Sequence, residues 1–169
     1  EALVELGGAL ELNPNDAYIH LKLGLTYAAL KRYDEAIDHY RQTSMLLPYH
    51  ASTYYHMGNI YSQMGDHDVA IENYLKALSL DPDFGQAYAN LGISYSNLGM
   101  LDEAIDAFTE ALRANPNDNA AYNNLGNAYL RKGDYENAVR AYKRQINLEP
   151  EMGQAHTNLG TAYVTNHDY

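Results

Sequence analysis

The sequence contains no cysteine and no tryptophan among its 169 residues. Without cysteine the chain has no disulfide and no thiolate-based metal site. No apolar run approaches the ~20 residues that a membrane-spanning helix needs, so we expect no membrane insertion. The lack of cysteine does not fix the compartment, because both cytoplasmic and periplasmic proteins can lack it. We favour the cytoplasm only weakly.

Basic residues are also scarce. The chain has 11 Lys and Arg against 22 Asp and Glu, which gives a formal net charge of -11. A protein that binds a phosphate backbone needs clustered Lys and Arg to release counterions. We therefore expect no nucleic-acid partner.

Patterns that carry chemistry are missing as well. The sequence has no glycine-rich phosphate loop, no Ser/His/Asp arrangement and no nucleophile elbow. None of its seven histidines forms a close i, i+4 pair with another histidine. The acidic pair Asp102 and Glu103 opens an expected helix, where the helix dipole favours carboxylates. We predict that the chain is not an enzyme and holds neither a metal nor another cofactor.

Proline is rare, but its spacing is regular. The five prolines follow one another at intervals of 34 residues: Pro14, Pro48, Pro82, Pro116 and Pro150. Three further columns keep this period, namely Gly24, Gly58, Gly92, Gly126 and Gly160, then Tyr27, Tyr61, Tyr95, Tyr129 and Tyr163, then Ala36, Ala70, Ala104 and Ala138. Four columns at one period indicate a repeat protein.

Each unit of 34 residues reads as two helices. A glycine that tolerates a left-handed backbone, such as Gly65, Gly99 or Gly133, ends the first helix. The second helix starts with carboxylates and stops at proline. We expect Gly92 and Ala104 to let the two helices touch. Because a single hairpin buries little apolar surface, stacking must supply the core. Gln145 stands where the fold needs a small residue, so we expect looser packing there.

These columns carry a family resemblance. The third unit reads Tyr88, Leu91, Gly92, Tyr95, Ala104, Phe108, Ala111 and Pro116. This pattern resembles the tetratricopeptide repeat (TPR) family over essentially the whole chain. The resemblance implies an all-α fold, a right-handed superhelical solenoid of antiparallel helix hairpins with about ten helices.

The period also predicts the organisation of a single array. Residues 1–16 read as the second helix of a preceding repeat and residues 153–169 as the first helix of a following one. The complete repeats are 17–50, 51–84, 85–118 and 119–152. We expect the chain to be a segment of a longer array.

The resemblance also implies that the first helices line a concave groove. The 22 acidic residues all lie outside the five first helices, which we expect at residues 17–30, 51–64, 85–98, 119–132 and 153–166. The groove is therefore neutral and rich in amides. The candidate peptide-binding residues are Lys22, Tyr55, His56, Asn59, Asn90, Asn123, Asn124, Asn127, Arg131 and Asn158.

Asparagine is a poor helix former, so its abundance in these helices calls for a reason. Its side chain offers one acceptor and two donors, which can pair with the backbone of an extended peptide. The alternative is that these amides are solvated or brace the adjacent helix. The column Asn90, Asn124 and Asn158 resembles the asparagine ladder in the repeat superhelix of the glycosyltransferases that attach N-acetylglucosamine to proteins. Lys22 and His56 interrupt that ladder in the first two units.

We therefore predict a scaffold that binds a protein or an extended peptide in its groove. Two alternatives remain open: a substrate-recruiting arm of a larger enzyme such as a glycosyltransferase, and self-association through the end repeats. Family members that bind the C-terminal carboxylates of chaperones use clustered Lys and Arg on consecutive first helices. Leu21, Tyr55 and Ala89 stand at the matching positions here, so we expect no such carboxylate clamp.

Overall fold

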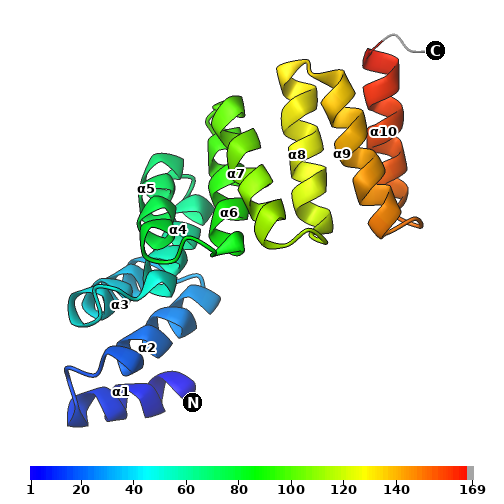
Figure 1. Cartoon of the computed structure of the whole chain (residues 1–169). Coiled ribbons are helices and arrows are strands. Elements are labelled where there is room, and N and C mark those ends of the chain that lie inside the picture. Colours follow the sequence, from blue (N-terminus) through cyan, green and yellow to red (C-terminus); the bar gives the residue numbers. More distant parts are fainter. Residues whose placement is uncertain (167–169) are drawn as a thin grey trace. The chain divides into compact units, whose positions relative to one another are not determined.

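The computed structural model describes residues 1–166, and in this part of the chain it contains ten α-helices and no strand (Figure 1). The chain divides into two compact units, Glu1–Pro82 and Asp83–Tyr169, which we call unit 1 and unit 2. Unit 1 holds α1 (Ala2–Leu12), α2 (Ala17–Ala29), α3 (Tyr33–Leu46), α4 (Ala51–Met64) and α5 (His67–Leu80). Unit 2 holds α6 (Gly85–Asn97), α7 (Leu101–Ala114), α8 (Asn119–Lys132), α9 (Tyr135–Leu148) and α10 (Gly153–Thr165).

The helices confirm the predicted all-α solenoid. Each expected first helix begins at the predicted residue and ends at it or one residue before. The expected span 153–169 runs three residues past the described part of the chain. The repeat boundaries and the handedness of the superhelix stay predictions.

The turns inside the hairpins use the left-handed backbone that the glycines predicted. Gly65, Gly99 and Gly133 have φ values of 88°, 78° and 83°. In the first hairpin the non-glycine residue Lys31 adopts this conformation instead, with φ 58°. A side chain in this region carries a steric cost that glycine avoids. One hairpin therefore turns without the residue best suited to the turn.

Within unit 1, helices next to each other in sequence pack together, and α2 also contacts α4. Its core contains one cluster of buried side chains from α3 and α4: Ala36, Ile37, Tyr40, Met57 and Ile60. Tyr40 is fully buried, and burial raises the pKa of its phenol to about 12. The ring therefore stays neutral and serves as packing.

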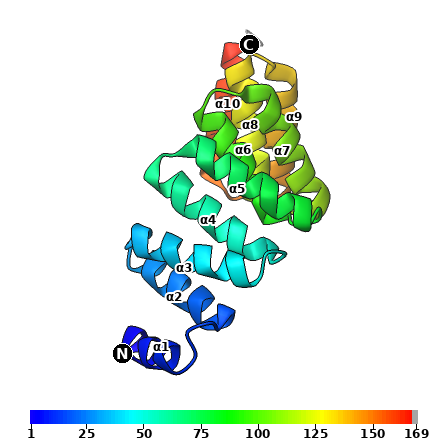
Figure 2. The ribbon, with the colours of Figure 1, turned by 90° about the vertical axis from the view of Figure 1, so that its left-hand side faces the viewer.

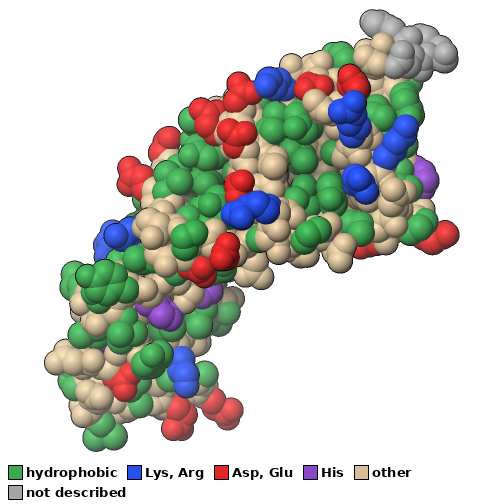
Figure 3. Space-filling model, in the orientation of Figure 1, with side chains coloured by type: hydrophobic (Ala, Val, Ile, Leu, Met, Phe, Trp, Pro, Cys, Tyr) green, Lys and Arg blue, Asp and Glu red, His purple; other side chains and the backbone are tan. Residues whose placement is uncertain are grey.

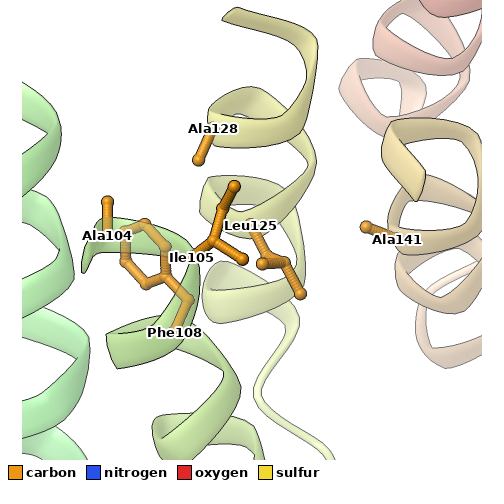
Figure 4. Close-up of a cluster of buried hydrophobic side chains, with 6 residues drawn as sticks. All are labelled: Ala104, Ile105, Phe108, Leu125, Ala128 and Ala141. Carbon is orange, nitrogen blue, oxygen red and sulfur yellow. The ribbon is translucent and has the colours of Figure 1, made fainter. Parts of the chain in front are cut away.

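Unit 2 is built in the same way. Its main cluster joins α7, α8 and α9 through the residues labelled in Figure 4: Ala104, Ile105, Phe108, Leu125, Ala128 and Ala141. Tyr95 and Tyr129 pack at its margin. The predicted role of Tyr95 and Phe108 in filling the space around the stacked helices agrees with this cluster.

The conserved spacing of glycine has a different cause from the one expected. A Cβ atom on Gly92 would lie 2.7 Å from the ring of Phe108, and one on Gly126 would lie 2.5 Å from the ring of Tyr142. Gly24 and Gly58 meet the rings of Tyr40 and Tyr74 in the same way. These glycines make room for the aromatic residue of the second helix.

Gln145 lies inside the molecule, with 2% of its surface exposed. Its Nε2 donates a hydrogen bond to Oδ1 of Asn119 over 3.0 Å, while its Oε1 has no partner within residues 1–166. A buried polar atom without a partner costs stability, so this position is less favourable than the alanine of the third repeat. The predicted looseness of packing stays a prediction.

No helix in residues 1–166 combines the length and the hydropathy needed to cross a membrane.

Candidate functional site

The predicted binding residues of unit 2 lie on α6, α8 and α10, which we call its first-helix face. Figure 2 shows these three helices on one side of unit 2 and α7 and α9 on the other. The three helices contain no acidic residue, so the face carries no carboxylate of its own. The segment Tyr122–Asn127, with three asparagines and a glycine, lies in α8.

The face has a hollow between α6 and α8, with a volume of about 360 Å³. Its polar lining includes Asn124 and Arg131, two of the predicted residues, and its apolar lining includes Ile93 and Leu130. Nη1 of Arg131 donates a hydrogen bond to the carbonyl oxygen of Ser96 over 2.8 Å. This bond ties the guanidinium to the wall of the hollow and leaves its other donors available.

The three members of the predicted ladder differ in their surroundings. Asn124 is half-buried and makes no hydrogen bond through its side chain to any residue of 1–166. Asn158 is engaged at both ends, because its Nδ2 donates to Oδ1 of Asn123 and its Oδ1 accepts from Nε2 of Gln154, each over 2.8 Å. Asn90 is half-buried. Asn124 is therefore the ladder residue whose amide is available without breaking a bond to Asn123.

Two other predicted asparagines hold the aromatic column. The hydroxyl of Tyr74 donates to Oδ1 of Asn59, and that of Tyr142 donates to Oδ1 of Asn127, each over 2.8 Å. Tyr142 is fully buried, and burial raises the pKa of its phenol to about 12, so the hydroxyl keeps its proton. These oxygens serve the bracing role that the sequence left as an alternative. A second role in binding stays a prediction.

In unit 1 the predicted residues Tyr55 and His56 form an aromatic group on α4. The ring centroid of His56 lies 5.7 Å from that of Tyr40, in a stacked arrangement, and 5.4 Å from that of Tyr55. Burial, followed by the charge of His50, lowers the pKa of His56. Lys22 on α2 is exposed and forms no ion pair within the described chain. The clustered cations of a carboxylate clamp do not occur here.

Another histidine pair lies between α2 and α3. Nδ1 of His20 lies 2.9 Å from Nδ1 of His39, and Nε2 of His20 lies 3.1 Å from the carbonyl oxygen of Pro14. A carbonyl only accepts, so Nε2 of His20 carries its proton and His39 donates to Nδ1 of His20. Burial, then the charge of His20, lowers the pKa of His39. Residues 1–166 hold no group of three or more His, Asp or Glu side chains arranged for a metal ion.

Sequence reasoning did not identify two hollows on the opposite side of unit 2. One lies between α8 and α9, has a volume of about 430 Å³ and is lined by Tyr122, Leu125, Tyr129, Asn137, Arg140, Ala141, Lys143, Arg144 and Asn147; we call it the basic pocket. The other lies between α6 and α7, has a volume of about 260 Å³ and is lined by Tyr88, Leu91, Tyr95, Glu103, Asp106, Ala107 and Glu110; we call it the acidic pocket. The signal was present in the 34-residue columns, because aligning the second helices shows charges of opposite sign at equivalent positions.

Comparison with known families gives one consistent result. A tetratricopeptide repeat model matches residues 90–147 and 123–169, a second such model matches residues 8–38, and a TPR repeat model matches residues 58–99. None of the curated protein sequences matches the chain. The family models together cover both units.

Solved structures agree. A crystal structure of the MamA protein has a TM-score of 0.86 and 28% identity, over 90% of this chain and 83% of that one. YrrB, described as a TPR protein with an unusual peptide-binding site, has a TM-score of 0.85 and 22% identity, over 96% and 84% of the two chains, and shows the fold alone. The first TPR of Spaghetti (RPAP3), bound to an HSP90 peptide, has a TM-score of 0.66 and 26% identity, over 69% of this chain and 93% of that one.

The 34-residue columns, the helix hairpins with glycines beneath aromatic rings, the family models and the similar structures lead to one conclusion: the chain belongs to the tetratricopeptide repeat family.

Proposed function

We propose that the chain is a non-catalytic scaffold that binds an extended segment of a partner protein on the first-helix face of unit 2. The observation that carries the proposal is the hollow between α6 and α8, in which Asn124 has no polar partner within residues 1–166 and Arg131 is held at the wall. Such a site offers amide and guanidinium groups above an apolar floor. It suits a peptide backbone with one apolar side chain.

The similar structures support a protein-interaction role. The RPAP3 repeat is bound to a peptide, and YrrB is described by its peptide-binding site. The residues of this chain point to a different chemistry from recognition of a terminal carboxylate. Lys22 and Arg131 stand on separate units, and the asparagines between them are neutral.

The experiment is selection of peptides from a random library on the immobilised chain, followed by titration calorimetry of the selected peptides. Replacing Asn124 with Ala removes the available amide and should weaken binding by about two- to tenfold, because a net hydrogen bond contributes ~0.5–1.5 kcal/mol. Salt should change this binding little, since the contacting amide is neutral.

Asn117→Ala provides the matched control, because Asn117 is an exposed asparagine in the turn before α8. Its loss should leave binding unchanged. Equal binding by the parent and the Asn124 variant would remove the proposed contact. A selected peptide that competes for the basic pocket and not for this hollow would move the site to the other side of unit 2.

A further inference from the structure

The basic and acidic pockets occupy the same place in successive repeats. Each floor consists of a tyrosine, a leucine and a second tyrosine on the first helix: Tyr88, Leu91 and Tyr95 in one, Tyr122, Leu125 and Tyr129 in the other. At the rim, Asp106 of the acidic pocket corresponds to Arg140, 34 residues later, and Glu110 corresponds to Arg144. The fold accepts either sign of charge, so packing alone does not explain the cations.

The cations also stand out against the rest of the chain. Five of the 11 Lys and Arg residues lie within the 14 positions from 131 to 144, in a chain of net charge -11: Arg131, Lys132, Arg140, Lys143 and Arg144. Figure 3 shows Lys and Arg side chains gathered over the α9 side of unit 2, while acidic side chains predominate toward α7. The overall charge therefore does not predict this surface.

The internal contacts of the rim are weak. Arg144 forms no ion pair with any residue of 1–166. Arg140 pairs with Glu136 over 2.5 Å, but both side chains are more than two-thirds exposed, and exposed pairs contribute little. Nζ of Lys143 lies 5.6 Å from the ring centroid of Tyr163, which still leaves the ammonium its hydrogen-bond donors. The fold does not use up these three positive charges.

The floor adds an apolar surface. Tyr122 and Tyr129 are half-buried, so part of each ring faces the pocket. Burial, followed by the charge of Asp134, raises the pKa of Tyr129 and keeps its phenol neutral. The pocket thus combines aromatic faces with two guanidinium groups and an ammonium group.

We propose that the basic pocket docks an acidic segment of a partner protein, in which carboxylates flank an apolar side chain. The carboxylates meet Arg140, Lys143 and Arg144, and the apolar side chain rests on the two tyrosines. A second copy of this chain is a poorer occupant, because two chains of charge -11 repel each other. A phosphate backbone is also poorer, because three cations on a strongly acidic chain release few counterions.

The test uses a fluorescein-labelled peptide with glutamates around a central leucine and an amidated C-terminus, titrated into the full chain by fluorescence anisotropy. The amide ensures that a terminal carboxylate plays no part. We expect saturable binding that weakens as salt rises. The double variant Arg140→Glu and Arg144→Glu should weaken binding by about tenfold or more, because it replaces two attractions with two repulsions.

The matched control is the double variant Arg41→Glu and Lys76→Glu, which changes the net charge equally by replacing exposed cations of unit 1. We expect it to bind the peptide within about twofold of the parent. Equal weakening by both double variants would overturn the pocket, because only net charge would then matter. The absence of saturable binding by the parent would overturn it too.

Two further measurements separate the remaining outcomes. Amide chemical shifts of the parent, followed during the same titration, should move around residues 122–147 and not around Asn90 or Ile93; movement on the first-helix face would contradict the proposal. Sedimentation of the parent should show a monomer. Self-association abolished by the Arg140 and Arg144 changes would replace the acidic partner with a second copy of the chain. Loss of peptide binding at Asn124 leaves this proposal standing, so the two sites fail independently.

Discussion

The two units present different chemistry on equivalent first helices. In unit 1 the residues around the aromatic column are rings: His56 stacks on Tyr40, and Tyr55 lies 6.2 Å from Tyr74 between ring centroids. In unit 2 they are amides, with Asn127 bonded to Tyr142 and Asn123 bonded to Asn158. The difference teaches that the repeat fixes the position of the aromatic column but not the means by which its neighbours satisfy it.

The fourth and last glycines of the column give the largest expected contrast. Gly126→Ala places a methyl group 2.5 Å from the buried ring of Tyr142, whereas a Cβ on Gly160 meets nothing within 4 Å in the described chain. Overpacking costs about 1–3 kcal/mol, and alanine returns up to about 1 kcal/mol of helix propensity. We expect urea denaturation to show that the first variant is destabilised and the second unchanged or stabilised. Equal midpoints would contradict the role assigned to the ring.

The asparagine and tyrosine pairs allow a direct exchange between repeats. Asn127→Ile alone should destabilise unit 2 by about 1–3 kcal/mol, because the hydroxyl of Tyr142 loses its acceptor inside the protein. The double variant Asn127→Ile and Tyr142→Phe copies Ile93 and Phe108 of the preceding repeat and should recover most of the loss. A double-mutant cycle measures the coupling. Additive effects would show that the hydrogen bond contributes nothing.

The histidines predict that pH acts through unit 1. The pKa of His39 and that of His56 are lowered in the folded chain, chiefly by burial, so the unfolded chain binds more protons below its ordinary value of 6.5. Stability from these groups is complete above pH 6.5 and declines as the pH falls below it. His56→Asn, which copies Asn90 and Asn124, should flatten this decline in denaturation curves between pH 5 and 8. Unchanged pH dependence would mean that His56 titrates alike in both states.

The smallest effect concerns the amide without a partner. Asn124→Ala should leave stability unchanged or raise it by about 0.5 kcal/mol, because alanine is the better helix former and no hydrogen bond within residues 1–166 is lost. Asn158→Ala removes the bond to Asn123 and should not be stabilising. Thermal denaturation of both variants compares them directly. Marked destabilisation by Asn124→Ala would indicate that this amide braces α8.

The sequence predicted the helices well because each boundary has a local cause. Proline ends one helix, and the left-handed glycines Gly65, Gly99 and Gly133 end others. It could not separate the members of the asparagine column, since Asn124 and Asn158 are equivalent in spacing. Only the three-dimensional structure shows that Asn123 points its oxygen at Asn158.

The glycine column illustrates a second limit. Periodicity predicted a close approach at Gly92 but not the atom that approaches, because both Ala104 and Phe108 lie on the facing helix. The pocket charges differ from this case, since Asp106 and Arg140 are equivalent positions in the sequence. Their location beside a hollow required the structure, but their opposite signs did not.

The contacts between helices have a consequence for the kinetics of folding. The helices that pack together are neighbours in sequence or next but one, as with α6 and α8. Such local contacts close short loops, so folding should be fast and should begin in any hairpin. Each unit can then open and close by itself, and hydrogen exchange would record separate opening rates for units 1 and 2. A partner held in the hollow of unit 2 would slow exchange there first, giving the array an internal clock that reports which unit is occupied.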